Sequence, residues 1–247
     1  MSGHNKWSTI KHRKGAQDAK RSKIFTKIIK EITVAARLGG GDPDGNPRLR
    51  RALDAARDAN MPSENVTRAI KKGTGELEGV SYEELLYEGV GPAGTLFLLE
   101  VMTDNRNRTA AEIRKLFDKH GGQLGASGSA AWAFEQKGVI EVDGAADEEA
   151  LFEVSVGAGA DDVERVGESW RIKTPRTELE TVREAIEEAG MKVNEASLAY
   201  LPNTPKEVEG EDAATLIALY EALEDHDDVQ GVYADFELSE SALSALE

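Results

Sequence analysis

The chain has 247 residues, with 46 acidic and 30 basic side chains and no cysteine. This length predicts two or three compact domains, and the lack of cysteine excludes disulfides, thiolate catalysis and zinc sites that use Cys ligands. No apolar stretch approaches the roughly 20 residues that a membrane-spanning helix requires, and no apolar segment follows the basic N-terminus. We therefore expect a cytoplasmic protein without a membrane partner.

The charge is unevenly distributed along the chain. Residues 1–72 contain 17 Lys or Arg and 7 Asp or Glu, a net charge of +10, whereas residues 73–247 carry −26. Because salt screens charges over about 8 to 10 Å under physiological conditions, the basic third can attract a polyanion on its own. It is therefore a candidate nucleic-acid-binding segment, although the whole chain carries −16.

The basic third predicts three helices. Isoleucines recur at helical spacing between residues 20 and 38, and lysines occupy the opposite side of the same helix. Asn46 before Pro47 is a capping signal that predicts the start of a second helix. A third helix is expected from Ser63 to the glycines at 73–75. Short connections between these helices predict a three-helix bundle within residues 1–80.

The rest of the chain predicts α+β structure. Within residues 81–136, strand-like segments surround one amphipathic helix. Residues 137–205 follow the order βαββαβ, which is typical of the ferredoxin-like arrangement. A helix and a strand within residues 206–247 would complete the earlier ββαβ segment. We therefore predict a multi-domain α and α+β fold, with the N-terminal three-helix bundle and two ferredoxin-like α+β domains, one inserted in the other. The alternative is a consecutive string of domains.

Several element boundaries follow from this division. A strand over residues 130–136 is expected to end the first half of the discontinuous domain, and a separate strand over 139–142 to begin the inserted one. The last strand is expected over residues 229–238. In the helix predicted at residues 108–120, Asn107 or Thr109 is the expected cap.

The sequence contains no recognisable catalytic motif. The four histidines lack metal-ligand spacing. Residues 89–94 match G-x-G-x-x-G, but a strand rather than a helix is expected to follow, so we interpret them as a hairpin turn. No P-loop or nucleophile elbow is present. We expect no enzymatic activity, no cofactor, no metal and no small-molecule substrate.

The N-terminal segment combines residue types that bind nucleic acid. Residues 2–15 contain four Lys or Arg, two histidines and Trp7. Cations neutralise phosphates, and an indole ring can stack on an unpaired base. The simpler alternative is a solvated basic tail with Trp7 packed against the helices, and for Trp7 both remain open. Together with the lysine side of the first helix, the candidate residues are Lys6, Trp7, Lys11, His12, Arg13, Lys14, Lys20, Arg21, Lys23 and Lys27.

A second candidate cluster contains Arg106 and Arg108. It lies at a strand-to-helix junction, where free backbone N–H groups attract anions. The glycine-rich segment 121–129 follows the same helix and would let a backbone approach a polyanion closely. The alternative is a capping motif, with both arginines in ordinary surface ion pairs, next to a flexible loop. The sequence leaves these two interpretations open.

The chain also resembles the YebC family, which includes the bacterial YebC and PmpR proteins and the mitochondrial translational activator of cytochrome c oxidase. The resemblance covers the whole chain in order and is carried by Gly3-His4-Asn5-Lys6-Trp7-Ser8, Asn46-Pro47, Met61-Pro62, Arg68-Ala69-Ile70, Tyr87-Glu88-Gly89, Thr103-Asp104-Asn105-Arg106-Asn107-Arg108 and Trp132 with Phe134.

The resemblance implies an N-terminal helical domain, two α+β domains and no enzymatic activity. Members of the family have been described as DNA-binding transcriptional regulators, and also as translation factors that associate with the ribosome and help it through consecutive prolines. The positions that match the basic motifs of the family are Lys6, Lys11, Lys14, Arg106 and Arg108. From this resemblance and the charge distribution we expect a nucleic-acid-binding regulator of the DNA-binding type. A ribosome-associated, RNA-binding translation factor is the alternative.

Overall fold

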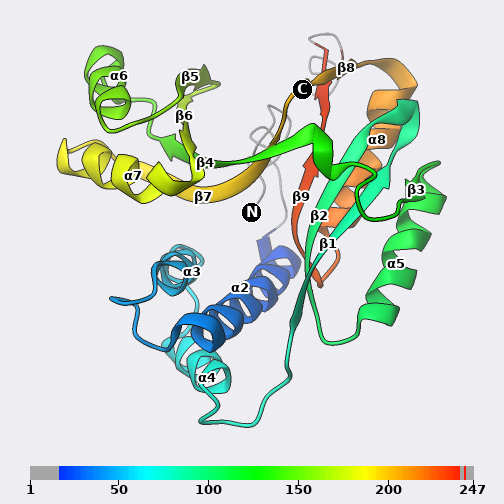
Figure 1. The fold of residues 1–247 in the computed structure, drawn as a ribbon, viewed down its shortest axis with the longest axis horizontal. Helices are drawn as coiled ribbons and strands as arrows, with labels where there is room; N and C mark the ends of the chain where they lie inside the picture. Colours follow the sequence, from blue (N-terminus) through cyan, green and yellow to red (C-terminus); the bar gives the residue numbers. More distant parts are fainter. Residues whose placement is uncertain (1–16, 240–241, 243–247) are drawn as a thin grey trace. The chain divides into compact units, whose positions relative to one another are not determined.

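A computed structural model of the chain describes residues 17–239 and Ala242, with side chains from Arg21 onward. These residues form a mixed α/β fold with seven α-helices and two four-stranded sheets (Figure 1). They divide into two compact units, one made of residues 17–130 and 210–232 and the other of residues 131–209 and 233–239. No helix in the described ranges has the length and apolarity needed to cross a bilayer.

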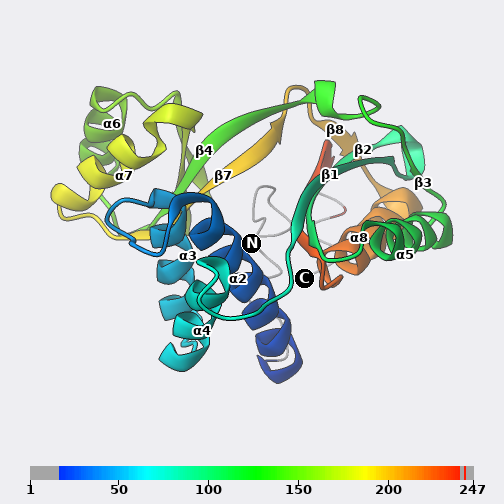
Figure 2. The same ribbon diagram turned by 60° about the horizontal axis from the view of Figure 1, so that its bottom comes forward.

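Three helices begin the first unit: α2 (Gln17–Gly39), α3 (Pro47–Asp58) and α4 (Ser63–Gly73). Both shorter helices lie beside α2 (Figures 1 and 2). They share a core formed by Ile32, Ala35, Leu49, Ala52, Ala56, Met61 and Ala69. The three helices lie where the sequence predicts them, because the apolar periodicity indicates each of them and the Asn46 side chain caps the start of α3.

The connection between α2 and α3 shows how local sequence sets this geometry. Gly40 has a φ of +85°, which ends α2 and which an L side chain rarely adopts. The Asn46 side chain accepts a hydrogen bond from the Leu49 N–H at 3.1 Å, as expected of an N-cap. Its amide also donates to the carbonyls of Ala35 and Gly40, so the same residue fixes α3 against the end of α2.

The first unit also contains a sheet with the strand order β3-β1-β2-β9. Its elements are β1 (Glu83–Val90), β2 (Leu96–Thr103), α5 (Arg106–Lys119), β3 (Gln123–Leu124), α8 (Gly210–Glu224) and β9 (Val229–Ala234). Strands β1 and β2 form an antiparallel hairpin, which confirms the predicted hairpin, although its connection begins only after Val90 because Gly89 and Val90 belong to β1. Helices α5 and α8 lie side by side (Figure 2). Phe117 of α5 packs edge-on against Phe97 of β2, with ring centroids 5.7 Å apart.

The second unit contains an antiparallel sheet with the order β5-β6-β4-β7. In chain order its elements are β4 (Phe134–Val142), α6 (Glu148–Gly157), β5 (Asp162–Val166), β6 (Ser169–Pro175), α7 (Leu179–Glu188) and β7 (Val193–Pro202). The core between the helices and the sheet includes Ile140, Leu151, Ile172, Val182 and Ile186. Two further strands, β8 (Lys206–Val208) and β10 (Phe236–Leu238), pair in parallel.

Some predicted boundaries are wrong. One uninterrupted strand, β4, replaces the two strands expected on either side of Lys137, because β7 pairs with it along its whole length. The last predicted strand is divided between β9 and β10, which belong to different sheets. The short strands β3 and β8 were not expected. A strand of two or three residues is too short to show an alternating pattern in the sequence, so only its pairing with a distant strand reveals it.

Candidate nucleic-acid interface

Six candidate residues, Lys6, Trp7, Lys11, His12, Arg13 and Lys14, lie outside the described residues, and so does the side chain of Lys20. Their role as nucleic-acid contacts stays a prediction. The first candidate side chain in the described range is Arg21, which is exposed. Its guanidinium lies 5.4 Å from the centre of the Phe25 ring, and Nη2 donates to the Asn60 carbonyl at 3.4 Å.

The lysine side of α2 faces the C-terminal end of α8. The Lys23 Nζ lies 3.1 Å from an Asp225 carboxylate oxygen and 3.0 Å from the Asp225 carbonyl. The Lys27 Nζ donates to the Glu224 carbonyl at 2.7 Å. Unpaired carbonyls and carboxylates at a helix C-terminus attract cations. Lys23 and Lys27 would therefore have to give up intramolecular partners before they could bind phosphate.

Lys27 also differs electrostatically from an ordinary surface lysine. Burial lowers its pKa from 10.5 to about 8, although Glu224, Asp225 and Asp227 partly oppose the shift. A lysine with this pKa is less fully protonated near neutral pH than a solvated one. The charge of Lys27 therefore depends on pH in the range just above neutral, where a solvated lysine stays fully protonated.

One turn further along α2, Lys30 is only 6% exposed. Its Nζ lies 2.5 Å from Oδ1 of Asp228 and donates to the Asp227 carbonyl at 2.9 Å. The helical spacing predicts that Lys30 belongs to the lysine side of the helix, away from the apolar core, and its burial shows that this prediction is wrong. Its acidic partners lie almost 200 positions later, and its Nζ also donates to the Met102 carbonyl and lies over the Tyr82 ring, so no local pattern indicates these contacts.

Asp228 is the centre of this buried ionic cluster. Its second oxygen, Oδ2, accepts hydrogen bonds from Arg108 Nη2 at 2.7 Å and from the Thr109 hydroxyl at 2.6 Å. Burial favours the neutral acid, but the bonds from Lys30, Thr109 and Arg108 outweigh it and hold the pKa of Asp228 well below its usual range. The cluster therefore anchors α2 to α5 and to the segment before β9.

The second candidate cluster lies at the start of α5. Asn105 caps this helix by accepting a hydrogen bond from the Arg108 N–H at 3.1 Å, so the expected caps, Asn107 and Thr109, are wrong. Arg106 and Arg108 are both exposed. Arg108 is paired with Asp104 at 2.9 Å and with Asp228. This pairing corresponds to the ion-pair alternative for Arg108.

The glycine-rich segment 121–129 is bound to the protein itself. The buried Glu88 carboxylate accepts hydrogen bonds from the N–H groups of Gly128 and Ala130, both at 2.6 Å. The Gly125 N–H donates to the Glu88 carbonyl at 2.7 Å. These three amides are therefore occupied, and a polyanion would compete with Glu88 for all of them.

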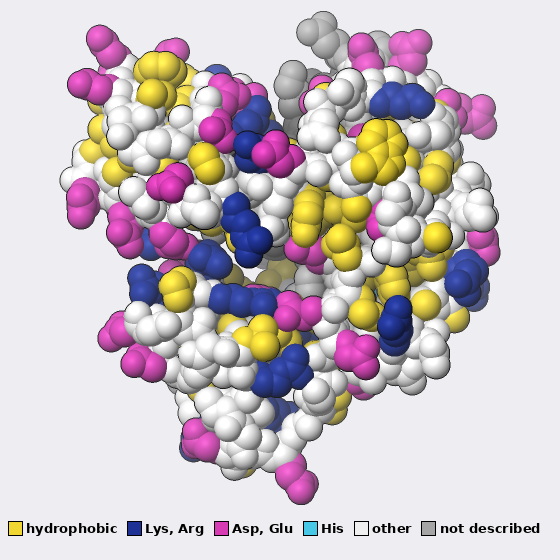
Figure 3. Space-filling view, viewed as in Figure 1, with side chains coloured by type: hydrophobic (Ala, Val, Ile, Leu, Met, Phe, Trp, Pro, Cys, Tyr) yellow, Lys and Arg dark blue, Asp and Glu magenta, His cyan; other side chains and the backbone are white. Residues whose placement is uncertain are grey.

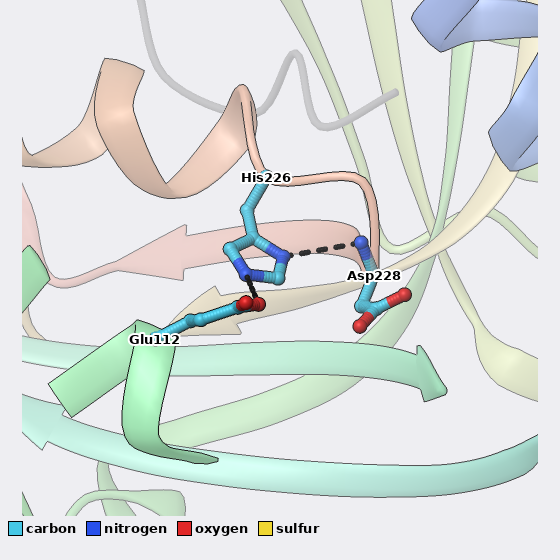
Figure 4. A group of neighbouring side chains, drawn as sticks. All are labelled: Glu112, His226 and Asp228. Atoms are coloured by element: carbon cyan, nitrogen blue, oxygen red, sulfur yellow. Dashed lines mark hydrogen bonds and ion pairs between the residues drawn. The ribbon is translucent and has the colours of Figure 1, made fainter. Parts of the chain in front are cut away.

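Glu112, His226 and Asp228 bring three possible metal ligands together (Figure 4). The His226 Nδ1 accepts from the Asp228 N–H at 3.1 Å, and Nε2 lies 3.0 Å from Glu112, so the neutral ring carries its proton on Nε2. Both Asp228 oxygens already accept from Lys30, Arg108 and Thr109. With no free lone pair on the ring and two cations adjacent, the group does not suit a metal ion.

A metal-binding test should therefore give a negative result. We expect millimolar Zn²⁺ or Mn²⁺ to leave the melting temperature of the untagged protein unchanged, since ligand binding to the native state would raise it. The measurement is thermal unfolding with and without the ion. A rise in melting temperature that disappears in His226→Ala would contradict this interpretation.

Six further cations of the first unit, on α4 and α5, are exposed. On α4 they are Arg68, Lys71 and Lys72, and on α5 they are Arg114, Lys115 and Lys119. The face drawn in Figure 3 shows Lys and Arg side chains interspersed with Asp and Glu. Local partners therefore decide how strongly each cation can attract a polyanion.

Comparisons with known proteins identify close relatives over the whole chain. Residues 5–76 match the family model of the TACO1/YebC protein N-terminal domain, and residues 82–236 match that of the TACO1/YebC second and third domain. A probable transcriptional regulatory protein of Geobacter sp. (strain M21) is 54% identical over 246 residues, 100% of each chain, and one of Geobacter sulfurreducens has the same identity and coverage.

A solved structure supports the same relationship. The crystal structure of a conserved hypothetical protein from Aquifex aeolicus has 48% sequence identity and a TM-score of 0.84, covering 90% of this chain and 93% of that one. Matches of this extent and identity, with both family models in chain order, establish that the chain belongs to the TACO1/YebC family.

Proposed function

We propose that this chain is a non-enzymatic regulatory protein that binds nucleic acid, of the DNA-binding, transcription-regulating type. The observation that carries the proposal is that full-length relatives with 54% identity are named probable transcriptional regulatory proteins. The basic charge of residues 1–72 agrees with it, because Lys and Arg supply most of the free energy with which proteins bind phosphate chains.

We further propose that the three domains have different roles. Residues 1–80 would bind nucleic acid. The two acidic domains would restrict that binding, because their carboxylates repel the phosphates of other nucleic acids. These domains are residues 81–136 with 206–247 and residues 137–205. Arg106 would contribute at the edge of the second domain, and Arg108 would contribute less, since it is already paired with Asp104 and Asp228. Lys23 and Lys27 are expected to contribute least, since both already have partners on α8.

The N-terminal cations provide the direct test. Replacing Lys11, Arg13 and Lys14 together with Ala should reduce the slope of log affinity against log salt by about two to three units, because each phosphate contact releases counterions. The measurement is a salt titration of binding to duplex DNA, with circular dichroism to show an unchanged fold. An unchanged slope would mean that this segment makes no phosphate contacts.

DNA and RNA targets require separate binding measurements. Filter binding with promoter DNA, random duplex DNA and purified ribosomal particles compares the two, and a transcription regulator should prefer one promoter to random DNA by a large ratio. Equal binding to all duplexes together with cosedimentation with ribosomes would contradict the DNA proposal and support the ribosome-associated alternative.

A further inference from the structure

The exposed face of α4 carries several polar side chains in register. Ser63, Thr67 and Lys71 are spaced four residues apart, and Glu64 and Arg68 follow the same spacing beside them. Residues at this spacing lie above one another on one side of a helix. The opposite side packs inward through Ala69, Val66 and Ile70. The sequence therefore places both cations on the solvent side of α4.

A loop turns back along this face and forms a groove. Gly75, with a φ of +83°, reverses the chain after α4. The Leu77 N–H then donates to the Lys71 carbonyl at 3.1 Å, which brings Leu77 against the helix, where it stays 44% exposed. The resulting open groove, here called the α4 groove, is lined by Ser63, Glu64, Thr67, Arg68, Lys71 and Leu77.

The cations of α4 differ from those of α2 in their partners. Arg68, Lys71 and Lys72 are exposed, and none of them has an ion pair or a side-chain hydrogen bond with another described residue. By contrast, Lys23 and Lys30 of α2 are paired with carboxylates, and so is Arg48 of the neighbouring helix α3. Cations without intramolecular partners can bind phosphate without first breaking an existing contact, so they retain the full gain from counterion release.

We propose that the α4 groove binds the sugar–phosphate backbone of a polynucleotide. Arg68 and Lys71 lie about 4.5 Å apart along the helix axis, so they can contact neighbouring phosphates of one strand. Ser63 and Thr67 offer hydroxyl donors one turn apart, and Leu77 offers an apolar surface for a sugar. The first turn adds the backbone N–H groups of Ser63 and Glu64, because Pro62 at the N-cap makes no side-chain hydrogen bond to them, whereas the Asn65 N–H already donates to the Pro62 carbonyl.

The form of the groove favours a chain over a single small anion. A small phosphate ligand needs an enclosed pocket with convergent donors, whereas this groove is open and its donors follow the helix axis. Glu64, near the start of the helix, is the one unfavourable group in the lining. Removing this carboxylate should strengthen the binding of a polynucleotide, whereas removing the cations should weaken it. The inference rests on the proposed nucleic-acid-binding function and assigns that function a surface.

Charge reversal in the full-length protein tests the proposal. We expect Arg68→Glu with Lys71→Glu to weaken binding to a labelled 20-mer at least tenfold and to reduce the salt slope by about two units, since two phosphate contacts are lost. Fluorescence anisotropy with duplex DNA, single-stranded DNA and single-stranded RNA of one sequence shows which nucleic acid the groove prefers. The neutral pair Arg68→Gln with Lys71→Gln should give a smaller loss, and Glu64→Gln a gain of about twofold.

The control is Lys115→Glu with Lys119→Glu, which reverses two exposed cations, four residues apart, on α5. This variant should lose less than threefold, and thermal unfolding should show that all variants are folded. A loss for Arg68→Glu with Lys71→Glu no larger than that of the control would overturn the α4 assignment. Equal competition by polyglutamate and by a polynucleotide of the same charge would also overturn it, in favour of acidic protein partners.

The experiment separates this inference from the proposed function. Replacing Lys11, Arg13 and Lys14 could weaken binding as expected while the α4 changes have no effect. That result would support the proposed nucleic-acid-binding function and contradict only the assignment of the α4 groove. If the unaltered protein binds none of the three polynucleotides at low salt, both proposals fail.

Discussion

The Asp228→Ala variant is expected to lose about 3 to 5 kcal/mol of unfolding free energy, because it leaves the buried Lys30 ammonium without its counter-ion. The same change removes one of the acceptors of Arg108 and one of the acceptors of Thr109. Urea denaturation followed by circular dichroism measures the loss. A variant as stable as the parent protein would show that the cluster does not hold α2 in place.

The matched control is Asp225→Ala, which removes an exposed partner of Lys23 on the same segment. Exposed ion pairs contribute about 0 to 1 kcal/mol, so this change should lower the unfolding free energy by no more than that amount. The double variant Lys30→Met with Asp228→Leu should recover part of the loss, because well-packed apolar side chains can replace a buried ion pair. Failure to recover would indicate that packing around the pair, rather than its charge, determines stability.

The stabilising effect of the Asp228 carboxylate should depend on pH in the acid range. The pKa of folded Asp228 lies below that of an unfolded aspartate, near 3.9. Its contribution is therefore fully present above about pH 4 to 5 and is lost as the pH falls through the folded pKa. The difference in unfolding free energy between the parent protein and Asp228→Asn should shrink as the pH falls below 4. A constant difference would contradict this assignment.

The Ile32→Asp variant is expected to unfold the helical part of the first unit. Ile32 is 0% exposed and belongs to the core shared by α2, α3 and α4. A carboxylate there has no partner, and its burial costs several kcal/mol, comparable with the whole stability of a small domain. Far-ultraviolet circular dichroism should show lost helix, and binding to nucleic acid should fall with it.

Leu38→Asp is the control on the same helix, since Leu38 is 63% exposed. Surface substitutions usually change stability by no more than about 0.5 kcal/mol, so helix content and binding should be retained. Equal loss in both variants would mean that helix α2 tolerates no added charge on any face, and the burial argument would then be wrong.

The capping and turn residues show how much of the fold could be predicted from the sequence. Asn46 before Pro47 and the glycines after α2 fix their elements through local backbone chemistry, so these boundaries were predicted correctly. Alternating and helical apolar patterns likewise identified β1, β2, α5 and α7. At the boundary between the expected domains, however, β4 continues through Lys137, because a partner strand some 60 residues away extends the pairing.

The sequence by itself determined which segments are helices, which residues form their apolar faces and where positive charge is concentrated. Only the tertiary structure decided which of those charges remain available. Lys23, Lys27 and Lys30 share one pattern with the exposed cations of α4, yet the end of α8 and Asp228 occupy them. Helical periodicity depends on neighbours within a few residues, whereas an ion pair depends on whatever the fold brings within about 4 Å, regardless of its distance along the chain.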